Sequence, residues 1–190
     1  MPQEICYNTP DMNGKLKFTL KAWPMIAVAT IGLCFVTQGV AKLFGIDLPD
    51  QQNVEVVRAW LCRAFESPKA FANCALLLAQ VLVILPAVEE VVFRLLLWKL
   101  PAGAAKKAAK RFPALEASWP SLVLAAVSSA LFSAAHYIAQ PFPDAAFLAL
   151  FFFGFAQCCL YHKTERIWCP MLNHFLFNLT NIVLLLILPQ

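Results

Sequence analysis

The chain has 190 residues, of which 61% are apolar and only 14% are charged, and its formal net charge is +4. A soluble domain carries roughly 25% charged residues, so this chain lacks the polar surface that water requires, and a soluble globular class is excluded. No basic run is interleaved with aromatic residues, so we expect no nucleic-acid partner. The composition predicts one domain, residues 1–190, that is integral to the lipid bilayer.

Long apolar stretches follow one another along the chain. Each is long enough to cross, or nearly cross, a hydrocarbon core about 30 Å thick. They lie at about residues 22–44, 70–98, 119–138, 145–161 and 167–188. We therefore expect an all-α, polytopic membrane helix bundle of about five transmembrane helices. The second stretch is the longest and must tilt, kink or protrude, and Pro86 predicts a kink because it removes the bond to the Leu82 carbonyl.

The segment between the first two stretches has a different pattern. Val54, Val57, Leu61 and Phe65 recur there at helical spacing, with charged residues between them. This periodicity predicts an amphipathic helix. It either lies in the membrane interface or forms an ordinary helical lid, and the sequence does not decide between the two.

Basic residues are distributed unevenly between the segments that flank the apolar stretches. With the N-terminus inside, ten basic residues fall on the inside and three on the outside, which predicts a cytoplasmic N-terminus for this multi-pass protein. The inside set is Lys15, Lys17, Lys21, Lys99, Lys106, Lys107, Lys110, Arg111, Lys163 and Arg166, and the outside set is Arg58, Arg63 and Lys69.

Ionisable and amide side chains inside the apolar stretches are costly in a bilayer, so they mark a candidate functional site. Glu90 and Arg94 are four residues apart and share a helix face, whereas Glu89 lies about 100° around the helix. Arg94 can therefore hold Glu90 while Glu89 points elsewhere. A buried carboxylate without a full set of partners is a good proton acceptor, so Glu89 is the candidate general base. The alternative is a structural ion pair with a spare carboxylate near a helix end.

The last apolar stretch carries His174 and Asn178, also four residues apart and hence on one face. An imidazole beside an amide donor suits general acid–base chemistry next to an oxyanion donor. The alternative is that both side chains tie helices together. His136, in the third stretch, is by itself better explained as an interhelical hydrogen bond, and Phe132 lies one turn earlier on the same face.

The predicted bounds place these residues at different depths. At about 1.5 Å per residue, Glu89 lies about 15 Å, His174 about 12 Å and His136 about 27 Å from the cytoplasmic edge. A tilted helix, or a third helix that begins in the cytoplasm near Pro113, would bring them level.

Taken together, the motifs resemble those of a known family. Glu89-Glu90-x-x-x-Arg94, Phe132-x-x-x-His136 and His174-x-x-x-Asn178 occur in that order on three apolar stretches. This set is similar to the three motifs of the CAAX-protease and bacteriocin-processing (CPBP, or Abi) intramembrane proteases. The resemblance covers roughly residues 70–182, which we expect to be the protease core.

The resemblance implies an all-helical, glutamate-dependent intramembrane endopeptidase that hydrolyses a peptide bond of a membrane-anchored protein or peptide. It implies that Glu89 activates a water with help from His136 and His174. It further implies that Asn178 stabilises the oxyanion while Glu90 and Arg94 organise Glu89. Some members of the family cleave prenylated CAAX proteins, but nothing in this sequence identifies a prenyl substrate or an oligomeric state.

Two questions stay open at the level of sequence. The first is a metal: Glu89, His136 and His174 could bind zinc, although Arg94 beside the carboxylates works against a cation, so we expect no certain cofactor. The second is the function, because intramembrane carboxylates and histidines also suit an ion or proton relay or a transporter. A non-catalytic relative that binds a peptide, as in immunity, is a further alternative.

Overall fold

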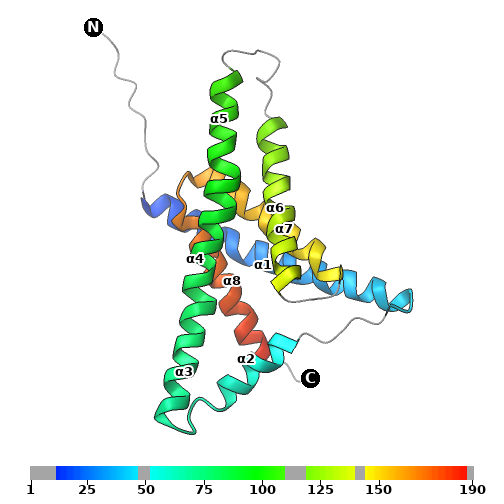
Figure 1. Ribbon diagram of the computed structural model, residues 1–190, viewed down its shortest axis with the longest axis vertical. Helices are drawn as coiled ribbons and strands as arrows, with labels where there is room; N and C mark the ends of the chain where they lie inside the picture. The colour runs from blue at the N-terminus through cyan, green and yellow to red at the C-terminus, as the bar shows by residue number, and fades with distance from the viewer. Residues whose placement is uncertain (1–11, 47–51, 110–118, 140–143, 188–190) are drawn as a thin grey trace.

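The computed structural model describes residues 12–46, 52–109, 119–139 and 144–187, and all regular secondary structure in these ranges is helical (Figure 1). Five of the helices are long and apolar enough to cross a membrane. The prediction of a polytopic all-α bundle is therefore confirmed. The helices are α1 (Met12–Leu43), α2 (Gln52–Cys62), α3 (Pro68–Ala79), η1 (Gln80–Ile84), α4 (Leu85–Glu89), η2 (Glu90–Lys99), α5 (Leu100–Ala109), α6 (Trp119–Ala139), α7 (Asp144–Thr164) and α8 (Trp168–Ile187).

The amphipathic segment forms α2, as its periodicity predicts. The helix ends at Cys62, however, so Phe65 lies beyond it and is exposed rather than part of an apolar face. Whether α2 lies in the membrane interface stays a prediction.

The elements from α3 to α5 form one continuous helix, which is the longest in the structure (Figure 1). Its start is capped by Ser67, whose hydroxyl accepts a hydrogen bond from the Ala70 N–H at 3.1 Å, and Pro68 occupies the first turn, where its missing N–H costs nothing. The candidate span Pro68–Ala108 has 41 residues, or about 60 Å of helix, which is twice the hydrocarbon thickness. The predicted end at Trp98 was wrong: the alanine-rich stretch after it continues the helix, because alanine has the highest helix propensity.

This long helix contains two π-helical segments, η1 and η2, on either side of α4. At the end of η1 the Leu85 N–H bonds to the Gln80 carbonyl, five residues back. In this register the Val81 carbonyl faces Pro86, which has no N–H to donate. The prediction from Pro86 counted four residues back, to Leu82, because it assumed an α-helical register. In the π register, the carbonyl that lacks a backbone donor is therefore that of Val81 and not that of Leu82.

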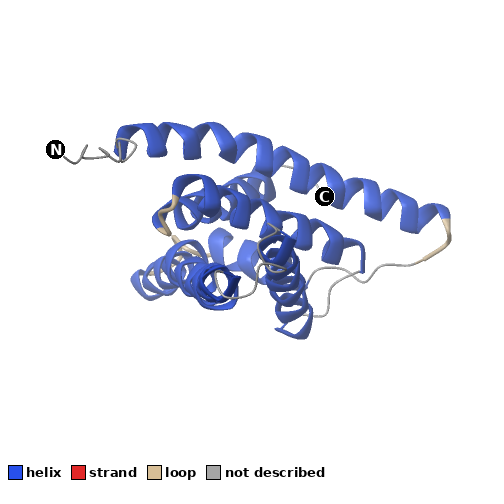
Figure 2. Ribbon diagram, turned by 90° about the horizontal axis from the view of Figure 1, so that it is seen from above, coloured by secondary structure: helices blue, strands red, loops and turns tan. Residues whose placement is uncertain are grey.

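The remaining helices pack around the middle of the long helix. α6 packs against η2 and α5, whereas α1 and α7 cross these helices steeply and pack against each other, and α8 runs obliquely between them (Figure 1). Viewed from above, α1 lies along one side of the bundle (Figure 2). One buried cluster joins four spanning helices through Ala27, Phe132, Phe153 and Phe177.

Helices α6 and α7 approach each other closely at Gly154. A Cβ added there would lie 3.2 Å from the Cβ of Ser129 and 3.3 Å from Cδ1 of Phe132. The missing side chain therefore sets the distance between these two helices. It keeps Phe132, which is fully buried, beside the polar residues described next.

Candidate active site

The structure brings residues from three spanning helices together. Glu89 and Glu90 lie at the junction of α4 and η2, His136 lies near the end of α6, and His174 lies in the second turn of α8. The unequal depths expected from the sequence do not occur. About 30 Å of helix separate Glu89 from the end of α5, and about 26 Å separate His136 from the start of α6, at about 1.5 Å per residue. Because α5 and α6 pack against each other, the two residues lie level.

Glu90 and Arg94 form the innermost part of the site. Arg94 Nε lies 3.1 Å from Glu90 Oε2, and both side chains are completely buried. The Arg94 guanidinium carbon also lies 4.7 Å from the centre of the Phe132 ring, a cation–π contact. The four-residue spacing thus produces the ion pair that it predicts. Glu89 points away from this pair, towards two histidines.

His174 lies between the two carboxylates and is only 4% exposed. Its Nδ1 is 2.9 Å from Glu90 Oε1, and its Nε2 is 3.5 Å from Glu89 Oε2. A carboxylate accepts, so Nδ1 is the nitrogen that carries the proton and donates it to Glu90. This bond fixes the orientation of the ring, and Nε2 faces Glu89.

His136 is oriented in the same way by a different acceptor. Its Nδ1 lies 2.9 Å from the Phe132 carbonyl oxygen, which can only accept, so Nδ1 donates here too. Its Nε2 lies 3.7 Å from Glu89 Oε1. Two imidazoles from different helices therefore present Nε2 to the two oxygens of one carboxylate. Glu89 and His136 are 25% and 32% exposed, so small molecules can reach this side of the site.

Aromatic rings line the inner wall. The Phe132 ring centre lies 4.4 Å from that of His136 and 6.0 Å from that of His174, and the Phe153 ring lies 5.0 Å from that of His174. Phe132 and Phe153 are buried. This wall keeps water from the inner side of the site and strengthens the electrostatic interactions there.

Asn178 lies one turn beyond His174 and contacts the long helix. Its Nδ2 donates a hydrogen bond of 2.9 Å to the Val81 carbonyl, which Pro86 leaves without a backbone donor. An asparagine amide has two N–H groups, so one remains for another acceptor. This bond joins α8 to the long helix, as the structural alternative for Asn178 predicts.

Two buried residues of this region, Gln157 and Asn173, were not identified as candidates from the sequence. Gln157 Nε2 donates to Asn173 Oδ1 at 3.2 Å, which joins α7 to α8 at the residue before His174. Both amides are completely buried, and Gln157 Oε1 and Asn173 Nδ2 have no hydrogen-bond partner. Amide side chains within the apolar stretches of α7 and α8 were the available signal, because buried amides hold membrane helices together.

In the part of the chain that the structure describes, no group of three or more His, Cys, Asp or Glu side chains is arranged to hold a metal ion. Metal dependence is accordingly a question for experiment.

The fold and the site define a class: an integral, multi-pass helical membrane protein in which carboxylates and histidines come together between the spanning helices, where ionisable residues mark a functional site. The family follows from a comparison with family models. The model for Rce1-like proteins, described as "Type II CAAX prenyl endopeptidase Rce1-like", matches residues 71–180, which is more than half of the chain. The chain therefore belongs to this protease family, which confirms the family resemblance of its motifs. Comparisons with curated proteins and with solved structures give no match.

Proposed function

We propose that the protein is an intramembrane endopeptidase in which Glu89 is the general base. The observation that carries the proposal is the convergence of His136 Nε2 and His174 Nε2 on the Glu89 carboxylate, at 3.7 Å and 3.5 Å, on the accessible side of a buried ion pair. Such an arrangement of a carboxylate and two oriented imidazoles can bind a water and exchange protons with it.

In this mechanism a water bound at Glu89 attacks the scissile carbonyl carbon. Glu89 takes one proton from the water, and the remaining hydroxide forms the new carbon–oxygen bond. A proton then passes to the departing amine nitrogen as the carbon–nitrogen bond breaks, either from Glu89 or from one of the imidazoles. The products are a carboxylic acid and an amine, so the overall change is addition of one water.

The neighbouring residues have supporting roles in the proposal. Glu90 accepts the Nδ1 proton of His174 and is itself held by Arg94, so this pair orients the imidazole. A carboxylate that orients a histidine in this way also stabilises the imidazolium when it forms. Asn178 has a second amide N–H, to which we assign the developing oxyanion.

The substrate class is taken from the family description, which names a CAAX prenyl endopeptidase. We propose a membrane-associated protein or peptide with a prenylated cysteine near its carboxyl end as the substrate. The bond cleaved is the peptide bond that follows this cysteine.

The test is a cleavage assay on the purified full chain in lipid, with one CAAX peptide in prenylated and unprenylated forms. Wild type and Glu165→Gln, which changes an exposed glutamate outside the site, should release the carboxyl-terminal fragment from the prenylated peptide. Glu89→Gln and His174→Ala should release none while they keep a wild-type melting profile. An incubation with chelator distinguishes a water held by Glu89 alone from one held by zinc on Glu89, His136 and His174.

Three outcomes would contradict the proposal. Equal cleavage by wild type and Glu89→Gln would remove Glu89 from the base role. Peptide binding without cleavage by either form would favour the non-catalytic binding relative. Proton or ion flux across vesicles that is lost in Glu89→Gln, with no cleaved product, would favour the relay or transport function.

A further inference from the structure

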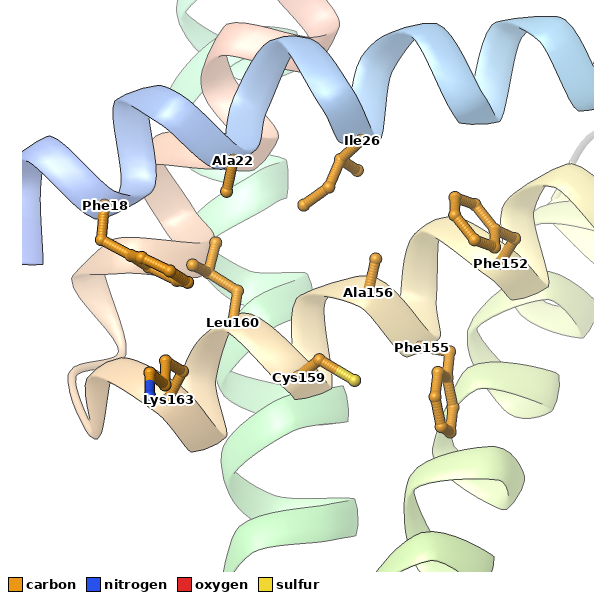
Figure 3. A pocket seen from close by; sticks show the side chains of 9 residues that line it. All are labelled: Phe18, Ala22, Ile26, Phe152, Phe155, Ala156, Cys159, Leu160 and Lys163. Atoms are coloured by element: carbon orange, nitrogen blue, oxygen red, sulfur yellow. The ribbon is translucent and has the colours of Figure 1, made fainter.

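A groove of about 430 Å³ runs between α1 and α7, and none of the candidate active-site residues lines it (Figure 3). Its walls include Phe18, Ala22 and Ile26 from α1 and Ala156, Cys159 and Lys163 from α7. Its size is within the range of small-ligand sites, about 300–1,000 Å³.

Two small residues in the lining, one from each helix, leave room for the groove. Ala22 and Ala156 project only a methyl group, whereas the bulkier Phe18 and Ile26 flank them on the α1 side (Figure 3). Both helices are candidate membrane spans, so their exposed surfaces face lipid. Apart from Lys163, the lining offers no charged group and no strong hydrogen-bonding group. An apolar chain is therefore the chemistry that fits the length of the groove.

The end of the groove at Lys163 is cationic. Lys15 lies seven residues before Ala22 on α1 and hence on the same face, about one turn before Phe18. In the described residues of α1 and α7 near this end, and in the turn after α7, there are five basic residues and one acidic residue, Glu165. The basic set is Lys15, Lys17, Lys21, Lys163 and Arg166, of which all but the buried Lys15 are exposed. Basic pockets between membrane helices select anionic headgroups.

We propose that this groove binds an anionic phospholipid, with one acyl chain along Ala22 and Ala156 and the headgroup phosphate at Lys163. The site is separate from the candidate active site, and the inference does not depend on the proposed peptidase function. The occupant is a lipid of the bilayer rather than the lipid chain of a substrate, because the charge at the groove end matches a phosphate and the site residues lie elsewhere.

The test is native mass spectrometry of the full chain after delipidation and incubation with equal amounts of phosphatidylglycerol and phosphatidylcholine. Wild type should retain phosphatidylglycerol in preference to phosphatidylcholine. Ala156→Phe fills the groove and should abolish this retention, and Lys163→Gln should weaken it about fivefold, the equivalent of one lysine–headgroup contact. Ala29→Phe, on an exposed face of α1, and Lys69→Gln, at the start of α3, are matched controls that should behave as wild type.

A melting profile identifies any variant that fails to fold, and Ala22→Phe then fills the groove from the opposite wall with the same expected loss. Undiminished phosphatidylglycerol retention in a folded groove-filling variant would overturn the proposal. Equal retention of the two lipids by wild type would also overturn it. Displacement of the bound lipid by a prenylated peptide, with no effect of Lys163→Gln, would assign the groove to the substrate instead.

Discussion

Removal of the Arg94 charge should destabilise the protein strongly, because it leaves Glu90 in a buried position without its counter-ion. Both side chains are completely buried and 3.1 Å apart, so neither charge is screened by water. Breaking a buried pair by removing one partner costs about 3–5 kcal/mol. We expect Arg94→Met to be at the lower end of this range, because His174 still donates to Glu90 and the unbranched methionine fills part of the volume of the arginine side chain. At about 2–4 °C per kcal/mol for a chain of this size, a loss of about 3 kcal/mol predicts a fall in Tm of about 6–12 °C.

The assay is thermal unfolding of the purified protein, followed by circular dichroism in a single detergent. The matched control is the double variant Glu90→Gln/Arg94→Met, which removes both charges but keeps a carbonyl oxygen that can accept from His174. If the unpaired charge causes the loss, the double variant should recover at least half of the fall in Tm. A double variant no more stable than Arg94→Met would show that lost packing is responsible. An unchanged Tm in Arg94→Met would refute the buried pair itself.

Two further predictions concern helix packing, and both are measured by the same unfolding assay. Gly154→Ala should destabilise the protein by about 1–3 kcal/mol, because the new Cβ would lie 3.2 Å from α6. Gly103→Ala, which has nothing within 4 Å of its Cβ, should instead stabilise by about 0.5–1 kcal/mol, and equal effects at the two glycines would contradict the close approach. Asn178→Leu should cost about 1–3 kcal/mol, because it leaves the Val81 carbonyl without a donor. The exposed Asn181→Leu makes the same chemical change without that loss and should be nearly neutral.

The fold class was predictable because a bilayer leaves few options. A spanning segment must satisfy its own backbone hydrogen bonds, so an apolar run of sufficient length predicts a helix almost regardless of its neighbours. The end predicted at Trp98 was wrong because it relied on hydropathy alone. The alanine-rich stretch from Leu100 to Ala109 contains two lysines and is not a continuous apolar run, so hydropathy placed it outside the span, although its alanines favour a helix. This single error produced the unequal depths of Glu89 and His136.

The separation of Glu89 from Glu90 was also predictable, because adjacent residues of a helix lie about 100° apart and only one of them can meet Arg94. The contacts of Asn178 and Gln157 could not be predicted from the sequence. The bond from Asn178 depends on the π register before Pro86, which no pattern of residue types specifies. The bond from Gln157 to Asn173 depends on which faces of α7 and α8 meet, and that is decided by packing across the whole bundle.

The burial of the polar residues divides them into two groups with different consequences. Glu90 and Arg94 are completely buried, and Glu90 contacts His174, which in turn lies 3.5 Å from Glu89. Glu89 and His136 are partly exposed, and His136 lies close to the end of α6. A hydrolase inside a membrane needs water at one point and must exclude it from the rest of the site. The gradient of burial from His136 through Glu89 and His174 to the ion pair fits the proposed function, in which we expect water and substrate to approach from the end of α6 rather than from the Phe132 wall.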